Sequence, residues 1–463
     1  MKTFFTKSAL YLALTIPAFF FLGCDDSEEG GSYEFSVEPT VLTFSAKQET
    51  QTLSVRTYGD WSIVLPQDAA WLKVSAMSGR GPAEIEVTAE NYYRTDTSRT
   101  ARLTVTGGNS GDLPVEVVQQ KLQMNDLSAA GKANCYIVPT SGDFVINAAT
   151  QGNSESEQVG EWTSAELLWE DNRELITDLY GDPESKRIFF STAAAGNAVI
   201  AVKDASGKIL WSWHIWATDF DPNAKTLKYT NDNGSTWEFM DRNLGAANAE
   251  SGSFGAFGLL YQWGRKDPFT AATAFAPENP SETIRWNMLN NPLPAMASDA
   301  DSMGTVQLSI EHPTSFYVTR YAHGDWNGQP DPDLWGAVSG QKTVYDPCPA
   351  GWRVPAYDAQ GDSPYAFVTR QTTTGTDNIG RIYTDGNGND FLFPVAGSRV
   401  NGTGTLDCPG NYGSLWTATG KTTSNEDGTI EYGCLLFFTT GRLVSATYYD
   451  TRSQGVSVRC VKE

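Results

Sequence analysis

Short runs in which apolar and polar residues alternate mark the segment 33–121. Such a period of two puts one set of side chains in a core and the other in water, so it predicts half-buried strands. Gly and Pro separate the runs, as expected for tight turns. The clearest runs are Thr52–Arg56, Glu84–Thr88, Ala101–Val105 and Val115–Val118. The pattern predicts a first β-sandwich here.

Similar runs recur over residues 133–219. They cover Cys135–Val138, Ala165–Trp169, Arg187–Phe190 and Ala198–Val202. We interpret this segment as a second, immunoglobulin-like β-sandwich.

A hairpin ends that second segment. Asp204–Gly207 supplies turn residues that lead into the strand Ile209–Trp216. Alternation along this strand places Trp211, Trp213 and Ile215 on one face, and Ser212, His214 and Trp216 on the other. His214 is therefore predicted to be a partly exposed strand residue.

Over residues 225–463 the alternating pattern gives way to long glycine-rich stretches with scattered aromatic residues, which predict loops. Leu259, Leu260 and Trp263 have helical spacing and predict a short helix that ends before Pro268. Near the end of the chain, Val456, Val458 and Cys460 share one strand face, and Arg459 points to the other.

The first 23 residues have the features of a signal peptide. Lys2 and Lys7 precede an apolar stretch, Ala9–Phe21, that is too short for a comfortable membrane span. The stretch ends in Leu22-Gly23-Cys24, which resembles the lipobox of bacterial lipoproteins. This resemblance implies that Cys24 carries lipid and anchors the mature protein in a membrane.

An acidic tether follows over residues 24–32. Its composition, with Asp25, Asp26, Glu28 and Glu29 beside glycines, predicts disorder. It also resembles the acidic export signal of Bacteroidetes lipoproteins, which implies a surface-exposed location on the outer membrane. The alternative is that the tether is a solvated spacer and carries no export signal.

Composition narrows the function classes. The chain has 463 residues, which is too long for one core and suggests about three domains. A formal net charge of −22 argues against nucleic acid and anionic membranes as main partners. With only 3 His and no metalloprotease helix motif, nucleophile elbow or phosphate loop, the sequence favours a non-enzyme without cofactor or metal. Asp385–Asp390 begins like a calcium loop, but a hairpin turn explains it better.

Residues 33–121 resemble the BACON domain of Bacteroidetes surface proteins. The resemblance is carried by Trp61-Ser62-Ile63, Trp71-Leu72-Lys73-Val74, Gly81, Asn91, Arg99 and Val117-Val118-Gln119-Gln120. It permits carbohydrate binding. Physically, Trp61 and Trp71 fit a sandwich core better than a sugar platform.

Residues 225–463 resemble the FISUMP family, which is similar to C-type-lectin-like folds. The motifs are Trp237–Ala246, Gly258–Phe269, Asp346–Pro355 and Ser457–Lys462. The whole chain is thus expected to be mainly β, with two β-sandwich domains followed by an α+β C-type-lectin-like domain. After Pro355, a Gly- and Asp-rich run, Ala356–Pro364, replaces the family's helix-forming run and puts the second helix in doubt.

Lipidation of Cys24 would leave five of the six cysteines in an oxidising compartment. Cys348, Cys408, Cys434 and Cys460 allow three connectivities. The lectin-like resemblance implies the nested pairing Cys348–Cys460 with Cys408–Cys434. Cys135 is then left as a buried free thiol. Formylglycine-generating enzymes share the lectin-like fold, but their activity needs a pair of neighbouring thiols. Cys434 and Cys460 are far apart in sequence, which argues against this activity.

The leading hypothesis is a surface protein for ligand binding or adhesion, directed at glycans or at host and cell-surface polymers. Asp325 and Trp326 in one loop, and Tyr448 and Tyr449 near the last strand, are the candidate contact residues. The alternative for these rings is a scaffold role. Two rival functions are a pilus tip or accessory subunit, which would associate with fimbriae, and a scaffold of a polysaccharide-uptake complex.

Overall fold

The computed structural model divides the chain into two compact units, with the boundary between Leu122 and Gln123. It describes residues 34–94, 97–107, 111–274, 280–296, 298–299, 304–318, 324–370, 376–377, 380–426, 428–441 and 443–463. The signal peptide, Cys24 and the tether at 24–32 lie outside the described residues. No helix in the described ranges has the length and apolarity needed to cross a membrane.

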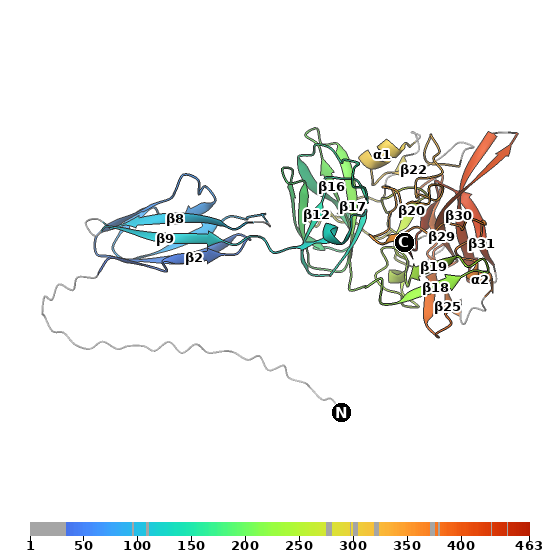
Figure 1. The fold of residues 1–463 in the computed structure, drawn as a ribbon, viewed down its shortest axis with the longest axis horizontal. Helices are drawn as coiled ribbons and strands as arrows, with labels where there is room; N and C mark the ends of the chain where they lie inside the picture. Colours follow the sequence, from blue (N-terminus) through green and yellow to red (C-terminus); the bar gives the residue numbers. More distant parts are fainter. Residues whose placement is uncertain are drawn as a thin grey trace, which may run out of the picture. The chain divides into compact units, whose positions relative to one another are not determined.

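The first unit is the predicted β-sandwich (Figure 1). One sheet has the order β1 (Ser36–Glu38), β3 (Glu49–Arg56), β7 (Ala83–Ala89), β5 (Leu72–Val74). The other has the order β2 (Val41–Phe44), β9 (Asp112–Gln119), β8 (Arg99–Thr106), β4 (Asp60–Val64), β6 (Ser78–Arg80). Alternate residues of the strands form one core, in which Leu53, Val87 and Val105 are fully buried. All four strands expected in this segment are present.

Trp61 belongs to the core of this sandwich, as predicted. Its Nε1 donates to the carbonyl oxygen of Gly81 at 3.0 Å. Gly79 lies against the ring, and a Cβ there would come within 2.5 Å of it, so no larger residue fits. Trp71 is only half-buried at the edge of the core.

The second unit begins with the other predicted sandwich. Its sheets have the orders β10 (Asn125–Asp126), β12 (Gly142–Asn147), β15 (Arg187–Thr192), β14 (Ile176–Asp182), and β11 (Cys135–Val138), β17 (Ile209–Ala217), β16 (Gly196–Lys203), β13 (Ser164–Glu170). A short 3₁₀ turn, η2 (Leu127–Ala130), precedes β11. The predicted hairpin joins β16 to β17, with Gly207 at a φ of 86° in its turn.

The C-terminal part of the second unit is mainly β as well. Its largest sheet has the order β28 (Leu406–Asp407), β27 (Ser398–Arg399), β32 (Gly455–Ser457), β29 (Tyr412–Asn425), β30 (Gly428–Thr439), β31 (Val444–Thr451), and β20 (Leu260–Gln262) also pairs with β32. Smaller sheets contain β18 (Thr226–Thr230), β19 (Thr236–Met240), β33 (Val461–Lys462) and β23 (Trp352–Arg353); β24 (Thr376–Asp377), β25 (Gly380–Thr384) and β26 (Asp390–Pro394); and β21 (Ser298–Asp299) with β22 (Phe316–Tyr317). The described helical elements here are short: η3 (Phe254–Ala256), α1 (Val306–Glu311) and α2 (Phe367–Arg370). Asp385–Asn389 forms the hairpin turn between β25 and β26, as interpreted.

The helix predicted around Leu259–Trp263 is wrong, because β20 occupies this place. Leu259, Tyr261 and Trp263 pack in one hydrophobic cluster, whereas Leu260 packs in another. Both faces of the strand are therefore buried. An apolar run that is buried on both sides shows no clean period of two, so its spacing resembled a helix.

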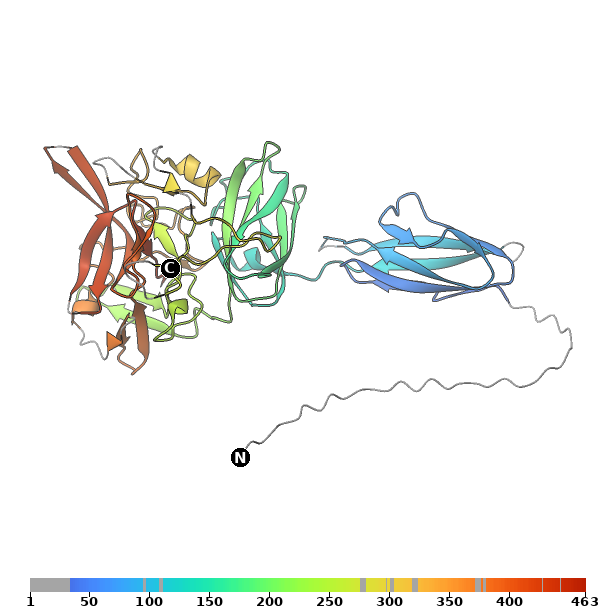
Figure 2. The ribbon, with the colours of Figure 1, turned by 180° about the vertical axis from the view of Figure 1, so that it is seen from behind.

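The second sandwich and the C-terminal part share a hydrophobic cluster, and the two lie side by side in both views (Figures 1 and 2). Trp216 from β17 belongs to this cluster, as do Trp263, Trp335 and Trp416 from the C-terminal part. The prediction that His214 is partly exposed is therefore wrong: it is 2% exposed, because the C-terminal part covers its face of the sheet. Burial lowers the pKa of His214 to about 3, and its Nε2 lies 3.0 Å from Oδ1 of Asn197.

Two charged residues are buried at the same junction. Oγ of Ser212, from the face opposite the core of the sandwich, donates to Oδ1 of Asp267 at 2.6 Å. Lys266 and Asp267 are both buried and form an ion pair at 2.8 Å. The two charges are taken out of water together, which is tolerable only when they remain paired and hydrogen-bonded.

The cysteines confirm one predicted pairing and correct the other. Cys348 and Cys460 form a disulfide, with an S–S distance of 2.03 Å. Cys408 and Cys434 are both free thiols, so the inner pairing is wrong. The carbonyl of Asn411, in the turn after Cys408, accepts a hydrogen bond from the N–H of Thr440, so Cys408 lies near Thr440. Cys434 precedes Thr440 by six residues, which is roughly 20 Å at strand spacing. A disulfide needs Cα atoms within about 7 Å. Cys135 is buried and free, as expected.

Candidate binding surface

Asp325 and Trp326 lie inside the second unit and do not form a contact surface. Trp326 is 1% exposed, and its Nε1 donates to the carbonyl oxygen of Trp263 at 2.6 Å. The carboxylate of Asp325 is paired with buried Arg452 at 3.0 Å. The two residues were predicted as ligand contacts from their loop position. That prediction is wrong, because the loop folds inwards and its ring fills the core.

Tyr448 and Tyr449, the other predicted pair, lie on the surface. Their exposed fractions are 44% and 39%. Both belong to β31, which is an edge strand of the largest sheet and, among the described strands, pairs with β30 alone. Neighbouring side chains of a regular strand point to opposite faces, yet these two rings stack with centroids 6.2 Å apart. They therefore meet around the edge of the sheet.

These two tyrosines belong to a longer tyrosine row, which we define as Tyr412, Phe437, Tyr448, Tyr449 and Tyr432. Consecutive rings of the row touch, with centroid separations of 5.5, 5.0, 6.2 and 4.9 Å. The rings come from β29, β30 and β31, so antiparallel pairing of three strands brings them together. The row thus joins half-buried rings on β29 and β30 to the two exposed tyrosines on the edge strand β31.

The sheet behind the row is anchored on both faces. Leu435 belongs to the large cluster shared with the second sandwich, whereas Leu436 and Phe438 pack in a separate cluster on the other side. The ladder between β30 and β31 has an irregularity between Leu435 and Phe437, which changes the register there. Such irregularities re-aim side chains at sheet edges. The rings are therefore mounted on a rigid support.

Polar groups border one end of the row. The ammonium of Lys421 lies 3.7 Å from the centroid of the Tyr449 ring, a cation–π contact. Glu431 accepts a hydrogen bond from Thr422 at 2.9 Å and faces Arg452 at 3.1 Å. Burial raises the pKa of Asp450 on β31. Aromatic faces beside fixed polar groups can stack on a flat ligand and direct its hydrogen bonds.

The first unit carries a smaller aromatic contact. The guanidinium of Arg99 lies between two rings, 4.2 Å from the centroid of Trp71 and 4.4 Å from that of Tyr92. Nε of Arg99 also donates to Oε1 of Gln119 at 2.9 Å. The cation thus covers one face of the Trp71 ring.

Within this first unit, one segment matches a known family. Residues 61–120 match the BACON family. Its description is "Putative binding domain, N-terminal". The matched segment contains both Trp61, which lies in the core, and the contact of Arg99 with the half-buried Trp71. No curated protein matches the chain.

Several solved structures also resemble parts of the chain. A GH5 xyloglucanase of Bacteroides ovatus, solved with a XXXG heptasaccharide, is 24% identical over 23% of this chain and 27% of its own, with a TM-score of 0.18. This chain therefore spans about a quarter of that enzyme. A Bacteroides thetaiotaomicron protein solved by NMR is 19% identical over 22% of this chain and 100% of its own, with a TM-score of 0.16. A Porphyromonas gingivalis W83 protein is 12% identical over 40% of this chain and 99% of its own, also with a TM-score of 0.16.

Sequence reasoning found two members of the tyrosine row and missed three. Tyr412, Tyr432 and Phe437 come from strands whose register the sequence does not reveal. The available signal was the density of aromatics between 412 and 449, which is typical of paired strands. In the described ranges, no group of three or more His, Cys, Asp or Glu side chains could hold a metal ion.

Proposed function

We propose that the protein is a lipid-anchored cell-surface protein that binds glycans through the tyrosine row, without catalysis. The observation that carries this proposal is the chain of five touching rings at an open sheet edge, two of them more than a third exposed. The BACON match supports a binding role, since the family's description names one.

The chemistry of the row favours sugars over acidic polymers. Pyranose rings present C–H groups that pack on aromatic faces, and their hydroxyls hydrogen-bond to neighbouring carboxylates. Asp450 follows Tyr449 on β31 and would supply such an acceptor next to the rings. A net charge of −22 repels polyanions, so a neutral glycan is the expected ligand class.

Replacing Tyr448 or Tyr449 with alanine should weaken glycan binding by the full mature chain roughly tenfold, because each ring supplies stacking area. A glycan array identifies the ligand, and titration of the best glycan measures the loss. Tyr58→Ala is the matched control, since Tyr58 is 61% exposed in the other unit. Binding that survives both row variants unchanged, or no glycan bound at all, would contradict the proposal.

The lipid anchor has its own test. In cells, Cys24→Ser should abolish incorporation of labelled palmitate and release the protein from the membrane fraction, because the thiol is the acceptor of the lipid. Cys135→Ser serves as the control, since this cysteine is buried in the fold. Retention of the Cys24→Ser variant in the outer membrane would show that something other than this cysteine holds the protein there.

A further inference from the structure

The second unit contains a cleft of about 650 Å³ beside the second sandwich. All of β11 forms one side of the cleft. The segment that follows β17, Thr218–Asn223, and the apolar residues Pro349, Ala350 and Trp352 form other parts of its lining. The volume falls within the range of ordinary ligand pockets. None of the residues of the tyrosine row lines this cleft.

The edge of a sheet is open towards this cleft. β11 is the first strand in its sheet and, within the part of the chain that the structure describes, pairs with β17 alone, in parallel. The N–H of His214 bonds to the carbonyl of Asn134, and the N–H of Thr218 bonds to that of Val138. In a parallel ladder this pattern means that the even-numbered residues of β11 bond to β17. The N–H and C=O of Ile137 therefore point away from β17.

The backbone of Ile137 has no hydrogen-bond partner among the described residues. An unpaired strand edge beside a cleft is a template for another strand, because an extended chain can satisfy these groups. The cleft keeps this part of the edge accessible, and its apolar lining offers a place for alternate side chains of such a chain.

The rim of the cleft is acidic. Asp126, Asp219 and Asp221 all line it, and all three are exposed. Asp126 is partly balanced by Arg187 at 3.6 Å. The rim belongs to a chain with a net charge of −22, so it attracts cationic groups. The complementary partner is an extended peptide in which apolar residues alternate with Lys or Arg.

We propose that this cleft binds such a cationic peptide segment of a partner protein as an added strand on β11. Main-chain hydrogen bonds to Ile137 hold the peptide, its apolar side chains enter the cleft, and its basic side chains face the three aspartates. This site is separate from the tyrosine row, so the protein would engage a protein partner and a glycan independently.

A synthetic peptide in which valine and lysine alternate tests the proposal with the full mature chain. Two analogues carry N-methyl groups, on the valines in one and on the lysines in the other. An added strand uses only alternate N–H groups, so one analogue should lose roughly tenfold or more in affinity while the other keeps it. Calorimetry measures each, and amide exchange at Ile137 should slow when the plain peptide binds. Equal affinity for both analogues, or no binding of the plain peptide, overturns the proposal.

A variant of the protein gives the reciprocal test. Ile137→Pro removes the outward N–H without removing a bond to β17, because proline is tolerated where an edge N–H faces outward. The Ile137→Pro variant should bind the plain peptide only as weakly as the unaltered protein binds the weaker analogue. Ile137→Val should keep the full affinity for the plain peptide. If Ile137→Pro fails to fold, the two analogues still decide the question on the unaltered protein. Tyr448→Ala should leave peptide affinity unchanged, so failure of this site and failure of the glycan proposal are distinguishable.

Discussion

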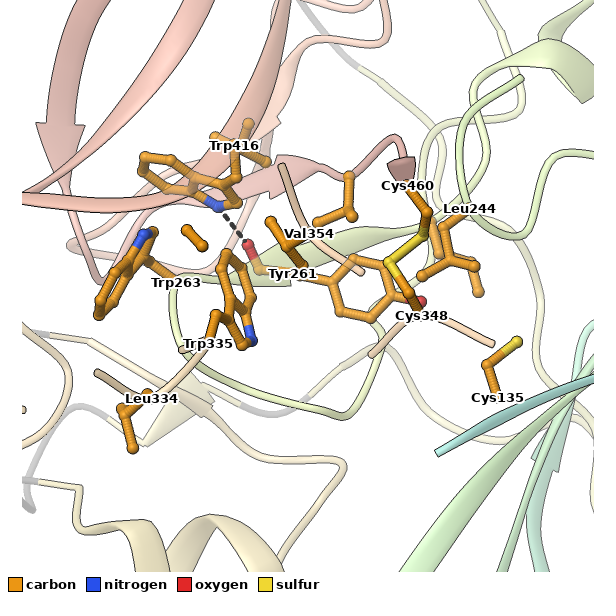
Figure 3. Packing of buried hydrophobic residues seen from close by; sticks show 14 of the residues in the cluster. Cys135, Leu244, Tyr261, Trp263, Leu334, Trp335, Cys348, Val354, Trp416 and Cys460 are labelled. Atoms are coloured by element: carbon orange, nitrogen blue, oxygen red, sulfur yellow. Dashed lines mark hydrogen bonds between the residues drawn. A yellow bond between two sulfur atoms is a disulfide. The ribbon is translucent and has the colours of Figure 1, made fainter. Parts of the chain in front are cut away.

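Replacing Cys348 and Cys460 together with alanine should lower the free energy of unfolding of the second unit by about 4–5 kcal/mol. The disulfide joins residues 112 apart in sequence, and on the chain-entropy account so long a loop restricts the unfolded chain strongly. Both cysteines are fully buried in the cluster shown in Figure 3, beside Tyr261 and Leu244. Denaturant titration of the variant and of the parent protein measures the difference, and reduction of the parent protein should reproduce it.

Cys408 and Cys434 provide the matched control for this prediction. Because they are free thiols, replacing both with alanine removes no cross-link. The loss should be about 1 kcal/mol or less, mainly from the packing of Cys434 on β30. A loss as large as that of the Cys348–Cys460 variant would mean that the inner pair is also bridged. Peptide mapping without reduction would then show that bridge directly.

The clearest strand predictions came from segments in which one face of the strand meets water. Ala101–Val105 and Val115–Val118 alternate because one sheet face is in the core of the first sandwich, and they appear as β8 and β9. The hairpin at Asp204–Gly207 was predictable too, because turn residues act locally. These signals need no knowledge of distant contacts.

Prediction failed where distant segments cover a surface. His214 lies on a sheet face that alternation assigns to solvent, but the C-terminal part of the unit buries it. Trp326 sits in a polar loop, yet its ring enters the same cluster. Cys408 and Cys434 belong to one region in sequence, but Cys408 precedes the end of β29 that pairs with Thr439, whereas Cys434 lies five residues earlier on β30. The exposure of a side chain depends on which distant segments pack over it, and these tertiary contacts cannot be read from a single sequence.

The candidate site divides in the same way. Tyr448 and Tyr449 could be identified because paired aromatics in a late strand are conspicuous in sequence. Their partners depend on the register among β29, β30 and β31, which is set by non-local pairing. The open edge at Ile137 was beyond sequence reasoning for the same reason, because it follows from the order of strands in a sheet.

Arg452→Met should destabilise the second unit by about 3–5 kcal/mol at neutral pH. The side chain of Arg452 is 1% exposed and pairs with Asp325 at 3.0 Å and with Glu431 at 3.1 Å. It also lies over the ring of Trp263, at 4.2 Å from the centroid. Methionine keeps much of the volume but removes the charge. Asp325, also 1% exposed, is then left buried without its cation, which is the costly case for an ion pair.

The loss from Arg452→Met should depend on pH in a defined direction. Burial already raises the pKa of Asp325, and Arg452 partly offsets the rise. Without the cation this pKa rises further above its value in the unfolded chain. The folded state then binds a proton more tightly than the unfolded state, so stability is lost as the pH rises through the folded pKa. The deficit of the variant should therefore be larger at pH 8 than at pH 5, as measured by denaturant titration.

The double variant Arg452→Met with Asp325→Asn separates charge from packing. Asparagine cannot ionise, so the double variant should recover part of the stability and lose most of the additional pH dependence. If instead the double variant is less stable than Arg452→Met at pH 8, the cost arises from lost packing on Trp263 and lost hydrogen bonds, and the buried carboxylate is not the cause. A deficit of Arg452→Met that does not change between pH 5 and pH 8 would lead to the same conclusion.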